Sequence, residues 1–184
     1  GERRLVYAFV SDKPVRYLAC VISRFRDVNT QQVQIGEGPE DIVTMKLLAN
    51  PRQVGRARSM SRRAAEIFAF YARLVGDAPY PSFTLGLTER DVPGGHSPAY
   101  FAVVDQPQQA GITWRNDPVN FDNYPFFFLA HEIAHQWWGQ AVGWKNYHEQ
   151  WLSEGFAQYF AAIYAEKNLS PGVFANVLRQ MRST

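Results

Sequence analysis

Along the first 50 residues, apolar and β-branched positions come in short runs that polar turn residues interrupt. Runs of Val, Ile, Tyr and Phe that are bounded by Gly, Pro, Asn and Asp are typical of β-strands. The sequence therefore predicts four strands in this part of the chain. They are RLVYAFV at 4–10, VRYLACVISRF at 15–25, QQVQI at 31–35 and IVTMKLL at 42–48.

The hydrophobic spacing changes at about Gln53, where apolar side chains begin to recur every three or four residues. This spacing predicts one amphipathic helix, which ends at the breaker sequence GDAPYP, residues 76–81. The apolar positions of the helix are Ala57, Met60, Ala64, Phe68, Tyr71 and Val75. Arginines in the same region also follow helical spacing, which favours a solvated helix face over a phosphate-binding track. They are Arg52, Arg56, Arg58, Arg62 and Arg63.

Two β-patterns follow this helix, SFTLGLTE at 82–89 and AYFAVVD at 99–105, and they predict two more strands. Helical patterns then fill the last third of the chain. Residues 125–138 predict one helix, with Pro125 suited to its first turn, and residues 147–167 predict the next.

Ser170 and Pro171 have the residue types of an N-cap and a first helical position, so a further helix is expected to begin there. Because the strands come first and the helices follow, the predicted fold class is α+β.

Composition narrows the class of protein. Apolar residues make up 46% of the 184 positions and charged residues 20%, which predicts a globular chain. The net charge of +2 is too small to indicate a nucleic-acid partner. Cys20 is the single cysteine, so an intrachain disulfide is excluded and any metal site must use His and carboxylate donors.

Neither a transmembrane segment nor a signal peptide is visible in the chain, because no apolar run is long enough. The chain opens in a strand-like pattern and closes inside a helical one, as a fragment would. We therefore expect it to be incomplete at both ends, which leaves its compartment and oligomeric state open.

His131 and His135 are the first candidates for chemistry. Residues four apart lie on one face of a helix, so the two imidazoles can converge on a metal ion such as zinc. Glu132 is rotated by roughly 100° around the axis, which suits a proton acceptor beside that ion. Glu154 lies on the next predicted helix at a matching height and could supply a third donor. Alone, the H-E-x-x-H pattern is short enough to occur by chance.

The stretch 131–160 closely resembles the zinc signature of the membrane-alanyl-aminopeptidase-like metallopeptidases, a gluzincin family. In that family H-E-x-x-H is followed by a glutamate ligand after eighteen residues, and His135 and Glu154 enclose eighteen residues. The resemblance implies a Zn2+ cofactor at His131, His135 and Glu154, with Glu132 as the catalytic general base. Further similar positions are Gln136, Trp137, Trp151, Leu152, Gly155, Phe156 and Ala157.

The resemblance also implies a thermolysin-like metallopeptidase catalytic domain. Residues 29–184 would form its N-terminal portion, and residues 1–28 would be the end of a preceding β-rich domain or edge strands. The tyrosine that polarises the tetrahedral intermediate in this family would lie beyond residue 184. Glu149 is a candidate outer carboxylate for a ligating imidazole.

The implied activity is zinc-dependent hydrolysis of a peptide substrate, with Glu132 accepting a proton from a zinc-activated water. The family's G-x-M-E-N loop corresponds to GGHSP, which gives Gly94, Gly95, His96 and Ser97 as substrate-binding candidates. An aminopeptidase is favoured.

Two alternatives to the aminopeptidase stay open. GGHSP lacks the acidic residue that would hold a terminal ammonium, which favours an endopeptidase that needs no free N-terminus. The other alternative is a non-catalytic scaffold with the metallopeptidase fold. A scaffold has no need of Glu132, which binds no metal.

Overall fold

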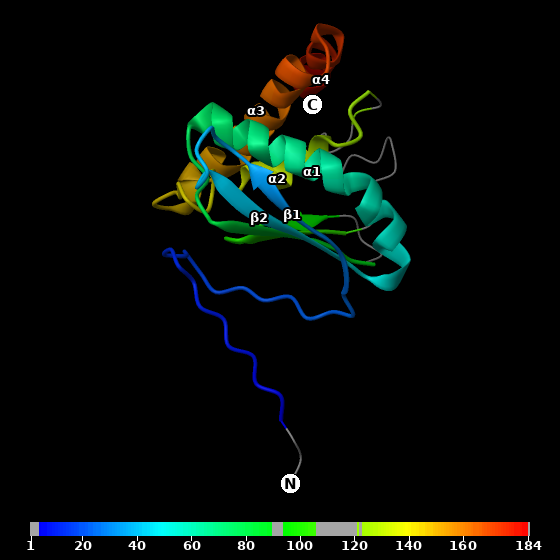
Figure 1. Ribbon diagram of the computed structural model, residues 1–184. Coiled ribbons are helices and arrows are strands. Elements are labelled where there is room, and N and C mark those ends of the chain that lie inside the picture. Colours follow the sequence, from blue (N-terminus) through cyan, green and yellow to red (C-terminus); the bar gives the residue numbers. More distant parts are fainter. Residues whose placement is uncertain (1–3, 90–93, 106–120, 122, 184) are drawn as a thin grey trace.

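The structure is a computed structural model that describes residues 4–89, 94–105, 121 and 123–183. A five-stranded sheet comes first and most helices follow it, which confirms the predicted α+β class (Figure 1). No helix in these described ranges is both long and apolar enough to cross a membrane.

The sheet has the strand order β1-β2-β3-β5-β4. Its central pairs, β2 with β3 and β3 with β5, are parallel, and the outer pairs are antiparallel. The strands are β1 (Arg26–Gln34), β2 (Ile42–Ala49), β3 (Ser82–Leu87), β4 (Gly95–His96) and β5 (Phe101–Val104).

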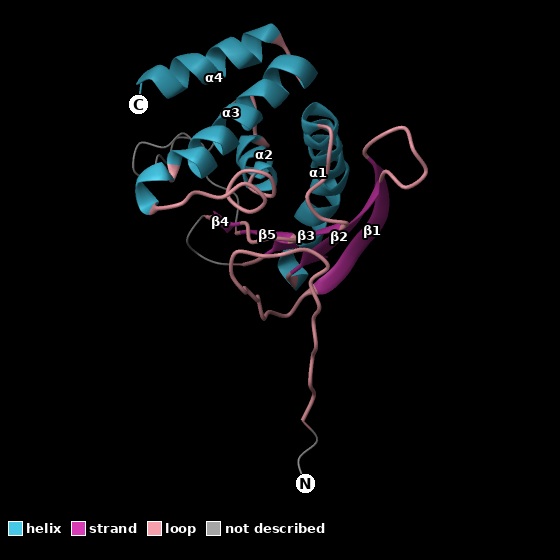
Figure 2. Cartoon of the chain, turned by 90° about the vertical axis from the view of Figure 1, so that its left-hand side faces the viewer, coloured by secondary structure: helices cyan, strands magenta, loops and turns pink. Residues whose placement is uncertain are grey.

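Four α-helices lie on one side of the sheet, and the N-terminal segment runs along the other side (Figure 2). They are α1 (Val54–Val75), α2 (Phe127–Ala134), α3 (Trp151–Asn168) and α4 (Pro171–Ser183), with short 3-10 turns at Pro51–Gln53 and Tyr147–Glu149. The N–H of Val173 donates to the Ser170 hydroxyl at 3.2 Å, so the predicted cap of α4 is confirmed.

The core lies between the sheet and α1 and continues under α2 and α3. β2 alternates buried and half-buried positions as a strand with one covered face should. α1 presents its apolar face to the sheet, where the ring of Phe68 packs against that of Phe83 with centroids 5.4 Å apart and an interplanar angle of 34°. Burying these side chains is the main favourable term that fixes α1 on the sheet.

The strands predicted at 4–10 and 15–25 are wrong. These residues have no regular structure, and apolar side chains such as Phe9 and Leu18 are more than nine-tenths exposed. A strand needs a neighbour for its backbone N–H and C=O groups, and the sheet of the described residues offers none to this segment. An apolar run of strand-like residues is therefore not sufficient to form a strand when no partner strand is available.

Several predicted boundaries also differ from the structure. The helix predicted at 147–167 begins as a 3-10 turn at Tyr147–Glu149, and α3 itself starts at Trp151. β1 starts at Arg26, so it includes the predicted turn RDVN, and the domain boundary expected at 28/29 falls inside it. A bulge between Asp27 and Asn29 lets this polar stretch continue the strand. α2 ends at Ala134, four residues before the predicted end, and His135 is its C-cap.

Candidate metal centre

Helix α2 positions the two histidines. Most of its residues are apolar and seven of its eight are buried, including His131 and Glu132, so it is packed against the core on nearly every side. His131 and His135 leave it one turn apart with their rings nearly perpendicular and the centroids separated by 4.6 Å. Their Nε2 atoms lie 3.0 Å from each other.

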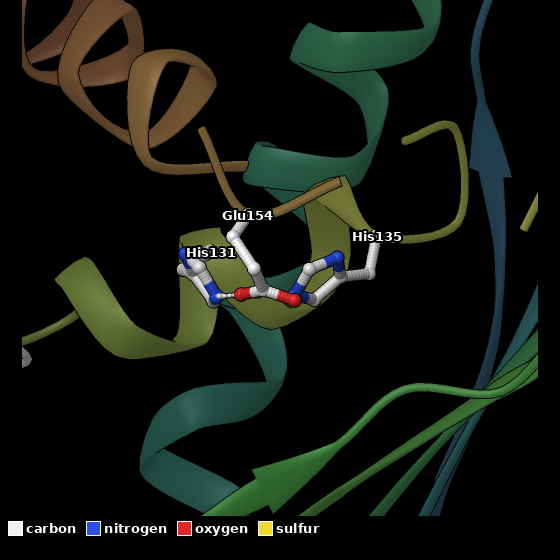
Figure 3. A group of neighbouring side chains, drawn as sticks. All are labelled: His131, His135 and Glu154. Atoms are coloured by element: carbon white, nitrogen blue, oxygen red, sulfur yellow. Dashed lines mark hydrogen bonds and ion pairs between the residues drawn. The ribbon is translucent and has the colours of Figure 1, made fainter. Parts of the chain in front are cut away.

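Glu154 completes the group from α3, where it lies in the first turn. Its Oε2 atom is 3.3 Å from Nε2 of His131 and 3.5 Å from Nε2 of His135. All three side chains point to one place between α2 and α3 (Figure 3). The helix pair that the sequence predicted therefore does bring the three donors together.

The spacing of these donors fits a zinc ion. With bonds of about 2.0–2.1 Å in a tetrahedral site, neighbouring donors are expected about 3.3 Å apart. The three observed separations are 3.0, 3.3 and 3.5 Å. Two imidazole Nε2 atoms that face each other are favourable only with a proton or a cation between them. The described residues thus assemble a donor set that could hold the predicted zinc cofactor.

The electrostatics of the group also favour a cation. Burial works to raise the pKa of Glu154, but hydrogen bonds from His131 and His135 outweigh it and hold that pKa well below its ordinary value. Burial works to lower the pKa of His135, but Glu154 and the charge of Glu132 outweigh it and raise that pKa. The carboxylates therefore stabilise positive charge at the point where the donors meet.

The second ring nitrogen of His135 is held by the segment after α2. Its Nδ1 lies 3.0 Å from the carbonyl of Trp138 and 3.1 Å from the hydroxyl of Ser153. Such outer contacts fix the orientation of a ligating imidazole. Nδ1 of His131 is buried without a hydrogen-bond partner among the described residues.

Glu149, the predicted outer carboxylate, lies elsewhere in the structure. It accepts a hydrogen bond from the backbone N–H of Lys145 at 2.8 Å, in the turn before α3. The outer contacts of His135 come instead from a backbone carbonyl and from Ser153. The sequence gives no way to predict the carbonyl, because every residue has one. Ser153 could have been proposed as an outer contact of His135, because it directly precedes the candidate ligand Glu154.

The segment between α2 and α3 is held in place by residues that the sequence motifs do not include. Gly139 has a φ of 112°, a conformation that residues with a side chain rarely adopt. The Arg16 guanidinium donates to the Gly139 carbonyl at 2.8 Å and lies over the Trp144 ring at 4.2 Å. These contacts hold the chain that leads from His135 to Glu154.

The GGHSP segment lies beside Glu132, which is 5% exposed. The Ser97 hydroxyl donates a hydrogen bond to Oε2 of Glu132. Gly95 is so close that a Cβ atom there would lie 2.6 Å from Oε1 of the same carboxylate. Gly94 lies against Asp105, whose N–H donates to its carbonyl at 2.9 Å.

His96, the fourth candidate in this segment, is exposed, and its ring stacks with Tyr17 at a centroid distance of 6.2 Å. The structure thus brings Gly95 and Ser97 to the candidate base. His96 and Gly94 face other parts of the chain.

Comparison with known proteins is consistent with this geometry. Residues 125–183 match the Peptidase family M1 domain, which confirms the family resemblance. The chain is 53% identical over 36 residues to aminopeptidase O of Mus musculus and 29% identical over 164 residues to aminopeptidase N of Canis lupus familiaris. It spans only 4% and 15% of the lengths of these relatives.

The fold is similar to a solved structure, the M1 zinc metallopeptidase from Deinococcus radiodurans. The TM-score is 0.58 at 19% sequence identity, and the match covers 87% of this chain and 33% of the other. This likeness extends beyond the zinc signature to most of the sheet and helices.

Proposed function

Because residues 125–183 match the Peptidase family M1 domain, we propose that this protein is a zinc-dependent peptidase of the aminopeptidase type. His131, His135 and Glu154 would hold the zinc ion, and Glu132 would be the general base. The observation that carries the proposal is the donor spacing of 3.0–3.5 Å. The buried Glu132, whose charge acts on His135, accompanies these donors.

A zinc ion held there would act as a Lewis acid, polarising a peptide carbonyl and making water more acidic. Glu132 follows the ligand His131 in the chain and is absent from the donor set, so its carboxylate stays available for proton transfer. It would accept a proton from the attacking water and pass it to the nitrogen of the leaving amine. Its burial keeps bulk water away from this exchange.

The substrate class follows from the GGHSP segment. His96 or Ser97 stands where the family has an acidic residue, and the Ser97 hydroxyl is already bonded to Glu132. Losing a charge-assisted hydrogen bond to a terminal ammonium removes about 1.5–3 kcal/mol, or roughly 10- to 150-fold in affinity. This observation favours a second candidate, a zinc endopeptidase that accepts peptides without a free N-terminus.

Glu132→Gln tests the proposed function directly. The variant should keep its zinc, because the three donors remain, and lose about 10²- to 10⁴-fold in kcat because the proton acceptor is gone. Zinc is measured by elemental analysis and turnover on amino-acid anilides and N-acetylated peptides. Glu37→Gln, at an exposed position, is the matched control.

Four outcomes test the candidate functions and the role of Glu132. Chelator-sensitive turnover of anilides alone supports the aminopeptidase, and equal turnover of N-acetylated peptides supports the endopeptidase. Loss of zinc from Glu132→Gln would contradict its role as a base. Inactivity of the wild-type protein on both substrates, with zinc bound, would leave the scaffold.

A further inference from the structure

We propose that Gly95 and Ser97 position the carboxylate of Glu132, so that the GGHSP segment acts on the proton acceptor rather than on a substrate ammonium. This inference rests on the proposed function, because it assigns Glu132 the role of base. It gives the two residues a positioning role, which is distinct from the substrate-binding role that the sequence resemblance implies.

The first support is the hydrogen bond between Ser97 and Glu132. Ser97 is 5% exposed, and its hydroxyl has one proton, which it donates to Oε2 of Glu132. A hydroxyl bonded to an ionised carboxylate makes one of the stronger hydrogen bonds in proteins. One carboxylate oxygen is therefore fixed, and Oε1 is left to receive the proton of the reaction.

The second support is the close approach of Gly95. A Cβ atom at this position would lie 2.6 Å from Cδ and Oε1 of Glu132 and 2.9 Å from Cζ of Phe128. Such distances are shorter than any relaxed contact, so a larger residue would push the carboxylate or the ring aside. Phe128 in turn stacks on the candidate ligand His131 with an interplanar angle of 8°. Glycine at 95 thus leaves the space that the Glu132 carboxylate and the Phe128 ring occupy.

The third support is that the segment is fixed relative to the chain that carries Glu132. Gln136 donates to the carbonyl of Pro98 at 3.0 Å, and Gln140 donates to the carbonyl of Ser97 at 2.9 Å. Both glutamines lie just after α2, within eight residues of Glu132. These two hydrogen bonds join the segment of Ser97 to the segment after α2 and so fix the position of Ser97 relative to the Glu132 carboxylate.

These contacts predict how substitutions divide between kcat and KM. A residue that holds the base changes the chemical step, whereas a residue that holds the substrate changes binding. For Ser97→Ala we expect kcat to fall roughly 10- to 100-fold, the weight of one hydrogen bond to a charged group, with KM changed less than about 2-fold. Ser97→Thr keeps the hydroxyl and should retain most of the rate.

Gly95→Ala gives an independent variant that does not depend on the hydroxyl. We expect the same pattern, a lower kcat at nearly constant KM, because the added Cβ displaces the Glu132 carboxylate. The matched controls are Ser59→Ala and Gly55→Ala on α1. Ser59 is exposed, and a Cβ at Gly55 meets nothing within 4 Å, so neither should alter turnover.

The experiment uses the protein at its full natural length, loaded with zinc, and measures zinc content and steady-state kinetics for each variant. A rise in KM for Ser97→Ala at unchanged kcat, or activity equal to wild type, would overturn the positioning role. So would a Ser97→Thr variant as slow as Ser97→Ala. Wild-type turnover that resists chelation would instead overturn the proposed zinc mechanism, so the two failures are distinguishable.

Discussion

Replacing Gly139 by alanine should lower both the stability of the fold and the affinity for zinc, because Gly139 lies beside the residues that contact His135. Its φ of 112° costs a residue with a side chain about 1–3 kcal/mol. The new Cβ would also overlap the hydroxyl of Ser153, and such overpacking adds about 1–3 kcal/mol. We expect the free energy of unfolding to fall by about 2–6 kcal/mol, measured by urea denaturation of the zinc-free protein.

The same substitution should lower zinc affinity. The Trp138 carbonyl and the Ser153 hydroxyl both contact Nδ1 of His135, and the added Cβ displaces the segment that carries them. Loss of such outer contacts typically reduces metal affinity about 10- to 100-fold. The zinc Kd is measured by competition with a chelator of known affinity.

A second variant separates the two causes. In Gly139→Ala with Ser153→Ala the overlap is relieved while the backbone strain remains, so part of the lost stability should return. Gly55→Ala is the control, and it should stabilise by up to about 1 kcal/mol because its helical position is open. If Gly139→Ala unfolds at the wild-type urea concentration and binds zinc as tightly, the proposed link between Gly139 and His135 is wrong.

Three further substitutions probe the surroundings of the metal centre. Glu154→Ala should weaken zinc binding by more than the roughly 100-fold that an outer contact can contribute, as chelator competition would show. Arg16→Ala should lower the free energy of unfolding by about 1 kcal/mol, because it removes the contacts with the Gly139 carbonyl and the Trp144 ring; an unchanged urea midpoint would contradict this. Trp137→Phe should lower it by about 1–3 kcal/mol, because the Asp77 carbonyl loses its donor at 2.9 Å, and identical denaturation curves would refute that role.

The regular part of the fold could be predicted where local spacing and tertiary packing agree. α1 was predicted within one residue of its start because its apolar spacing continues for 22 residues. Gly76, with a φ of 89°, ends it where the sequence indicated. Strands β2 and β3 could be predicted because turn residues bound their apolar runs on both sides.

The N-terminal segment shows where this agreement fails. Residues 4–10 have the residue types of a strand, yet they lie outside the sheet of the described residues. Whether an apolar run becomes a strand depends on a partner strand, and a partner is not encoded in the run itself. The shortened α2 has the same kind of cause, because the Trp138 carbonyl turns to His135 and its segment leaves the helix.

The convergence of the three candidate donors could be predicted because helix geometry turns sequence spacing into spatial position. The contacts that hold these donors in place could not be predicted from the sequence. The Arg16 contact joins positions 123 residues apart, and its acceptor is a backbone carbonyl that any residue possesses. The bond from Ser97 to Glu132 could not be predicted either, because it joins positions 35 residues apart whose distance depends on tertiary packing.

The residues of the candidate metal centre differ in burial, and we expect this difference to separate their effects on metal binding from their effects on folding. His131 and Glu132 are nearly buried and belong to the packed side of α2, whereas the Glu154 side chain is 50% exposed. An exposed carboxylate contributes little to folding, about 1 kcal/mol or less even when it is paired. Removing Glu154 should therefore weaken zinc binding while the zinc-free protein unfolds almost as before.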